Sequence, residues 1–174
     1  MISLNQLLES RDARAEHQKD LLGKYPGKSL LCLTVQLPGP EKRNTHSLAI
    51  ARAGVAAIRQ SFQPDYEELR DLETGYEGYF LVAGDPLDVK RRCCQIEDTH
   101  PLGRLMDIDV LANMPTANMT PTHIISREDI GYEPRKCLLC ENEVRYCMRA
   151  KTHTTSELLE RIKQILKDYE LQAP

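Results

Sequence analysis

Tryptophan is absent from this chain, and aromatic residues make up only 5% of it. Few flat side chains are therefore available on which nucleic-acid bases could stack. The chain also lacks an excess of basic residues, since its net charge is −3, so it has no broad positive field of the kind that attracts nucleic acid. These absences predict a protein without a nucleic-acid partner.

Long apolar runs are also missing. No stretch approaches the roughly 20 apolar residues that cross a bilayer. The N-terminal stretch is interrupted by Glu9, Asp12 and Glu16, which is not the pattern of a signal peptide. We therefore expect a cytoplasmic protein with no membrane partner, whose six cysteines are reduced thiols.

The length and the apolar pattern predict one globular domain over residues 1–174. Helical spacing predicts helices that begin after Ser3, run over 45–60 and 86–98, and begin again at Thr155 or Ser156. Apolar runs of strand length predict strands at 29–37, 79–83, 105–111 and 123–126, with a polar loop at 113–121. This alternation predicts an α/β or α+β fold, with a small mixed sheet flanked by helices and a nucleotidyltransferase-like architecture as one form of it.

Two aspartates lie in the third expected strand. Side chains alternate between the faces of a strand, so Asp107 and Asp109 should share one face, with Cα atoms roughly 6–7 Å apart, while Ile108 points into a core. Both carboxylates could reach one small cation or bridge two, and Mg²⁺ prefers such ligands. The alternative is an exposed strand face with two solvated carboxylates.

The turn at residues 100–104 leads directly into this strand. Gly103 would let the backbone approach a ligand closely. Arg104 offers a fork of donors suited to phosphate, or it serves as a counter-ion for the two aspartates. We interpret His100 as a structural residue of the turn.

Three cysteines and a histidine follow with the spacing C-x2-C-x6-C-x5-H, formed by Cys137, Cys140, Cys147 and His153. Their number and type match a tetrahedral structural zinc site. Buried small hydrophobic residues and a redox pair are the alternatives.

Basic residues flank the cysteines in the sequence. They could bind substrate phosphates or an acidic protein surface, or they could simply face solvent. They are Arg135, Lys136, Arg145, Arg149 and Lys151.

Residues 100–110, HPLGRLMDIDV, resemble the signature of the citrate lyase holo-acyl-carrier-protein synthases, also called apo-citrate lyase phosphoribosyl-dephospho-CoA transferases. Further similarities lie at residues 10–14, 38–42, 126–127 and 134–140, and at Cys147 and residues 151–153. The resemblance thus covers nearly the whole chain, although residues 60–96 carry no motif of the family.

The resemblance implies a reaction. The family transfers the 2′-(5″-phosphoribosyl)-3′-dephospho-CoA group from its triphosphate precursor, triphosphoribosyl-dephospho-CoA, to a serine of the apo acyl carrier (gamma) subunit of citrate lyase, and diphosphate leaves. This is nucleotidyltransferase-type chemistry, in which a metal neutralises and aligns the phosphates. The resemblance implies that Asp107 and Asp109 are the catalytic Mg²⁺ ligands.

The other site residues follow from the same resemblance. Arg104 is the first candidate for a phosphate contact, and Arg11, Arg14 and Lys42 are carried by motif similarity. A further metal-binding carboxylate is expected, and the candidates for it are Asp12, Glu128 and Asp129. The cysteine cluster has no part in this chemistry and is interpreted as structural.

Two other interpretations remain open at this point. A related synthase for another carrier, such as that of malonate decarboxylase, would share the metal chemistry and differ in its protein partner. A zinc-stabilised, non-catalytic binding module would centre on the cysteines and would tolerate replacement of the aspartates.

Overall fold

The computed structural model describes residues 2–113 and 122–172. The expected polar loop at 113–121 lies outside these residues, apart from Asn113, which ends a strand. None of the described helices is long and apolar enough to cross a membrane.

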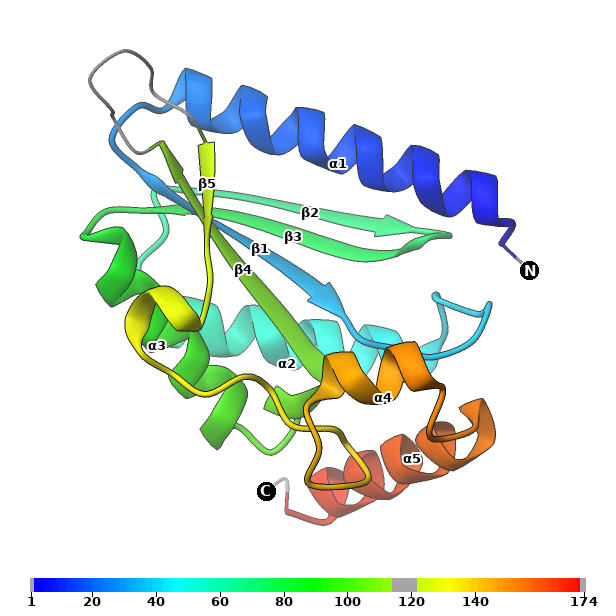
Figure 1. Ribbon diagram of the computed structural model, residues 1–174. Coiled ribbons are helices and arrows are strands. Elements are labelled where there is room, and N and C mark those ends of the chain that lie inside the picture. The colour runs from blue at the N-terminus through cyan, green and yellow to red at the C-terminus, as the bar shows by residue number, and fades with distance from the viewer. Residues whose placement is uncertain (1, 114–121, 173–174) are drawn as a thin grey trace.

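One five-stranded antiparallel sheet runs through the molecule, in the order β2-β3-β1-β4-β5 (Figure 1). The strands are β1 (Ser29–Val35), β2 (Tyr66–Leu72), β3 (Gly75–Val82), β4 (Met106–Asn113) and β5 (Thr122–Ile125). The α-helices are α1 (Leu4–Lys24), α2 (Thr45–Ser61), α3 (Pro86–Thr99), α4 (Val144–Ala150) and α5 (Thr155–Gln172), and short 3-10 turns lie at Gly103–Leu105 and Glu128–Ile130.

Helix starts follow from local side-chain chemistry. Ser3 forms a reciprocal capping box with Gln6, and Asn44 forms one with Ser47. Asp85 accepts hydrogen bonds from the first turn of α3, and a proline follows it. These polar caps satisfy backbone N–H groups that have no partner within the helix, and they fix where α1, α2 and α3 begin.

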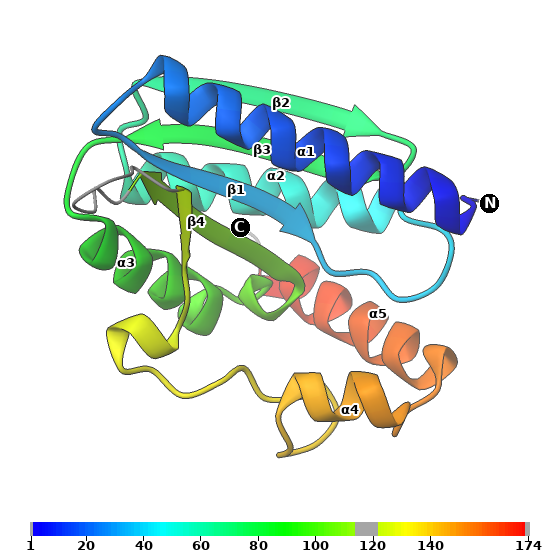
Figure 2. The ribbon, with the colours of Figure 1, turned by 45° about the horizontal axis from the view of Figure 1, so that its top comes forward.

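The sheet separates two packed layers. Helix α1 covers one face, while α2 and α3 cover the other (Figures 1 and 2). The larger core lies on the α2 and α3 face and also includes Ile162 and Leu166 of α5. The smaller core lies under α1 and contains Leu21, Leu22, Leu30, Cys32, Tyr79, Leu81 and Leu111.

The predicted α/β or α+β class is confirmed, but the sheet is not mixed. Every described pairing is antiparallel, namely β1 with β3, β1 with β4, β2 with β3, and β4 with β5. Helices α2 and α3 do connect strands that run in the same direction, as their alternation with strands suggested. In each case an antiparallel strand lies between the two, which is the split β-α-β arrangement.

The four expected strands are present as β1, β3, β4 and β5, and the four expected helices as α1, α2, α3 and α5. Strand β2 was missed because charged residues dominate it, which lowers its strand propensity. Its charged side chains form ion pairs with the helices on both faces of the sheet, since Glu67 pairs with Arg59 of α2 and Glu68 with His17 of α1. Helix α4 was also missed, inside the cysteine region.

Candidate active site

Asp107 and Asp109 lie on β4, directly opposite Thr34 and Cys32 of β1. Opposite residues of an antiparallel pair share a face. Cys32 belongs to the core under α1, so both aspartates point toward the α1 side, and Ile108 points into the opposite core. The common face that strand alternation predicts is therefore present.

The two carboxylates have different surroundings. Asp107 accepts hydrogen bonds from Gln36 Nε2 at 2.7 Å and from Arg135 Nη1 at 3.2 Å. Within the described residues, no hydrogen bond reaches the Asp109 side chain. Burial, followed by repulsion from Asp107, raises the pKa of Asp109 to about 6.

A divalent cation between the two carboxylates would relieve this repulsion. Two oxygen ligands on one strand face suit Mg²⁺, which usually fills its remaining positions with water and substrate phosphates. The donors present therefore fit the cation that the sequence predicted.

Side chains from outside the sheet complete the hydrogen bonding of β4. Strand β5 pairs only with residues 110–113, so the beginning of β4 has an open edge. Glu97 accepts from Ile108 N at 2.8 Å, and Lys90 donates to Ile108 O at 3.1 Å. Arg135 Nη2 donates to Met106 O at 2.9 Å. Three charged side chains thus take the place of a neighbouring strand beside the aspartates.

Glu97 and Lys90 were missed from the sequence. Both are buried on α3, and Arg127 Nη2 pairs with Glu97 at 2.9 Å. Their spacing in the sequence could have revealed them. Residues 90 and 97 are seven apart, so they lie on the same face of the helix as the buried Cys93. A buried charge at such a position needs a specific partner.

Arg14 reaches the aspartate face from α1. Its Nε donates to Glu77 Oε1 at 2.9 Å, and its positive charge acts on Asp109. Glu77 is buried on β3 and also accepts from the Tyr79 hydroxyl. Arg14 was predicted from the family motif, whereas Glu77, which holds it, was not.

Of the two roles expected for Arg104, the counter-ion of the aspartates is not what the structure shows, while the phosphate contact stays a prediction. Arg104 contacts neither aspartate carboxylate within the described residues, and its guanidinium donates to the carbonyls of Lys136 and Cys137. Arg135 serves instead as the counter-ion of Asp107. Gly103 also has another role, because an added Cβ would lie 2.5 Å from the carbonyl oxygens of α3, so the close approach is to that helix.

The remaining predicted cations lie near the loop after β1. Lys42 Nζ donates to the carbonyl of Leu37. Burial, and then the charge of Arg11, lowers the pKa of Lys42, which indicates that these two side chains are neighbours. The structure records no contact between them and Asp107 or Asp109 in its described parts.

The candidates for a further carboxylate are dispersed. Asp129 accepts from the backbone and side chain of Ser126, where it stabilises a turn. Glu128 begins the short helix beside it, and Asp12 is exposed on α1. None of the three makes a recorded contact with the aspartate pair among the residues described.

The cysteine cluster assembles as its spacing predicted. The donor atoms of Cys137, Cys140, Cys147 and His153 all lie within 4.8 Å of one another. Cys140 Sγ lies 3.5 Å from Cys147 Sγ and 3.3 Å from His153 Nε2. The cluster could bind a metal such as zinc.

The pKa of the Cys137 thiol is lowered, whereas burial and then hydrogen bonds with Cys140 and Cys137 raise the pKa of Cys147 to about 11. Burial raises the pKa of the Cys137 thiol, but hydrogen bonds from the backbone of Leu139 and Cys140 outweigh burial and lower it. A thiolate is the form that binds a metal. The other cysteines, Cys32, Cys93 and Cys94, are buried in the two cores.

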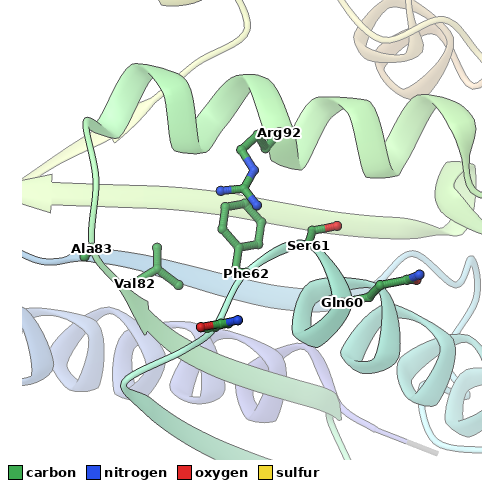
Figure 3. Close-up of a pocket in the computed structure, with 7 residues that line it drawn as sticks. Gln60, Ser61, Phe62, Val82, Ala83 and Arg92 are labelled. Atoms are coloured by element: carbon green, nitrogen blue, oxygen red, sulfur yellow. The ribbon is translucent and has the colours of Figure 1, made fainter.

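Two cavities lie on different sides of the sheet. One of about 350 Å³ lies between the end of α2 and α3, where the Arg92 guanidinium stacks 4.1 Å from the Phe62 ring centroid (Figure 3). It contains none of the candidate site residues. The other, of about 360 Å³, is lined by Arg14 and Glu77 together with Ser10 and Thr74. Neither aspartate lines this second cavity, but it lies on the α1 side of the sheet, toward which both aspartates point, and it shares Arg14 with their surroundings.

The chain is similar to known proteins over nearly its whole length. A family model described as apo-citrate lyase phosphoribosyl-dephospho-CoA transferase matches residues 2–169. Proteins of that name from Escherichia coli O1:K1 and Shigella boydii serotype 18 are each 38% identical over 173 residues. Each alignment covers 96% of this chain and 90% of the relative.

The raised pKa of Asp109 predicts a pH-dependent stability. Because the pKa rises from 3.8 to about 6 on folding, ionisation of Asp109 costs on the order of 3 kcal/mol without a cation. Below about pH 4 the Asp109 side chain is protonated in both the folded and the unfolded state, so this cost is absent. The protein loses stability as the pH rises through 6 and the folded state must ionise Asp109. In Mg²⁺-free buffer, Asp109→Asn should therefore increase the free energy of unfolding at pH 7.5 and have little effect near pH 4. Urea denaturation of both proteins at pH 4 and pH 7.5 measures the free energy of unfolding. An equal effect of the substitution at the two pH values would contradict the prediction.

Proposed function

This chain belongs to the family of apo-citrate lyase phosphoribosyl-dephospho-CoA transferases, and from that membership we propose that it attaches the prosthetic group of citrate lyase. The donor is triphosphoribosyl-dephospho-CoA, and the acceptor is a serine of the apo acyl carrier (gamma) subunit. Residues 1–174 act as one transferase domain in the cytoplasm. The observation that carries the proposal is the aspartate pair on β4, inside a chain that matches the family almost throughout.

In the proposed reaction, the serine oxygen forms a bond to the phosphorus next to the diphosphate. The bond from that phosphorus to the bridging oxygen breaks, diphosphate leaves, and the serine proton passes to a base. Bound Mg²⁺ would neutralise the phosphates and align the displacement.

Residues of the chain would bind the cation and the phosphates. Asp107 and Asp109 would hold the cation, with Asp107 oriented by Gln36 and Arg135. Arg14, fixed by Glu77, would bind the phosphates from the α1 side, and we propose it ahead of Arg104, which faces the cysteine segment. Arg11 and Lys42 would bind the outer phosphates.

Replacing an aspartate should abolish transfer. Asp107→Asn and Asp109→Asn are each expected to lower the rate by about a thousandfold, because the neutral amide binds the cation more weakly and does not neutralise its charge. Intact-protein mass spectrometry of purified apo carrier subunit, with donor and with or without Mg²⁺, measures the gain in mass on one serine.

Asp88→Asn is the matched control, since Asp88 is an exposed aspartate of α3 paired with Arg91. It should leave the rate unchanged. Full transfer by the folded Asp107→Asn and Asp109→Asn proteins would overturn the assignment. Transfer to the carrier of malonate decarboxylase, and not to that of citrate lyase, would identify the related synthase instead.

We further propose that the cysteine cluster binds one structural Zn²⁺. Four donors of the right type surround one point, as structural zinc requires. Purified protein should contain about one zinc per chain by elemental analysis.

Cys140→Ser should remove the zinc and lower the melting temperature by several degrees, because zinc binds the folded state only. Cys94→Ala, a change at a core cysteine, should retain the metal. Zinc-supplemented, reduced wild-type protein that contains no zinc would refute the proposal.

A further inference from the structure

Helix α4 presents an exposed face that combines basic and apolar side chains. Arg145, Met148 and Arg149 share one side of the helix, because they are three and four residues apart. Tyr146 lies beside Arg149 on the next row. Tyr146 is 61% exposed and Met148 is 70% exposed, and Lys151 follows directly after the helix. We call these five residues the α4 face.

The charge of this region contrasts with the rest of the chain. Residues 135–153 contain five basic and two acidic residues, a net charge of +3. The whole chain has a net charge of −3, so all other residues together carry −6. Among the described residues, Arg145, Arg149 and Lys151 have no recorded ion pair. The α4 face is thus a concentration of unpaired positive charge on an otherwise acidic protein.

A short chain of contacts connects the α4 face to the aspartates. The first residue of α4, Val144, donates its N–H to the carbonyl of Arg135 at 2.8 Å. The guanidinium of the same Arg135 binds Asp107. In Figure 1, α4 lies toward the end of the sheet at which β4 begins, and Asp107 is the second residue of β4. A protein seated on α4 would therefore have its own surface next to the catalytic carboxylates.

We propose that the α4 face is the docking surface for the protein acceptor, which contacts it through acidic side chains around a small apolar centre. This rests on the proposed function, which requires a protein to present a serine to the site. Tyrosine, methionine and arginine are the residues enriched in protein interfaces. Exposed Tyr146 and Met148 argue against phosphate binding, which needs converging donors in a concave site.

Kinetics with both substrates test the proposal. The double variants Arg145→Glu/Arg149→Glu and Arg145→Gln/Arg149→Gln are compared with wild-type protein for transfer to the apo acyl carrier subunit. We expect the reversed charges to raise the KM for the carrier by about tenfold or more, and the neutral pair to raise it less. The kcat and the KM for the triphosphate donor should stay within about twofold. Zinc content and circular dichroism verify that the cysteine region remains folded.

The matched control is Lys163→Glu/Lys167→Glu on α5, two exposed lysines with the same four-residue spacing. It should leave the KM for the carrier unchanged. If the control raised this KM as much as the α4 variant does, the rise would be a general effect of charge and the proposal would be overturned. A rise in the KM for the donor alone would assign the face to phosphate and also overturn it.

Direct binding separates this proposal from the proposed function. Calorimetric titration of the apo carrier subunit into wild-type protein and the reversed variant requires no catalysis. Binding that is lost in the variant supports docking even if no group is transferred. Transfer by wild-type protein, with unchanged carrier binding in the variant, supports the function and rejects the docking surface.

Discussion

The open edge of β4 is the constraint on which the candidate site depends. Its pairing with β1 places Asp107 and Asp109 on one face, but β5 is too short to cover the other edge beside them. At this edge, Glu97 and Lys90 form hydrogen bonds with the backbone N–H and C=O of Ile108. Hydrogen bonds to charged groups contribute about 1.5–3 kcal/mol each, and an unpaired buried charge would cost more. This arrangement fixes the strand from which both carboxylates project.

Arg135 connects this edge to the cysteine cluster. Its guanidinium binds Asp107 and the carbonyl of Met106, while its own carbonyl accepts from the first residue of α4. Arg104 makes a second connection, from the turn before β4 to the carbonyl of Cys137. Metal binding at the cysteines would therefore order the segment that orients Asp107, which gives a structural zinc a purpose in the transferase.

Local patterns in the sequence predicted those features of the site that depend on residues close together in the chain. Strand alternation placed Asp107 and Asp109 together, and cysteine spacing predicted the cluster with His153. The remaining partners depend on contacts across the fold, such as Glu77 with Arg14, 63 residues apart. For the same reason the carbonyl partners of Arg104, more than 30 residues further along the chain, could not be predicted. The polar strand β2 was missed because charged residues dominate it, although its partner strand β3 follows directly in the sequence.

The central claim is that Asp107 and Asp109 together hold a divalent cation. Titration of zinc-loaded protein with Mn²⁺, followed by electron paramagnetic resonance of the free ion, measures this without substrate. The account predicts Mn²⁺ binding that Mg²⁺ displaces and that weakens at least about tenfold in either aspartate-to-asparagine variant. Equal Mn²⁺ affinity in wild-type protein and in both variants would contradict it.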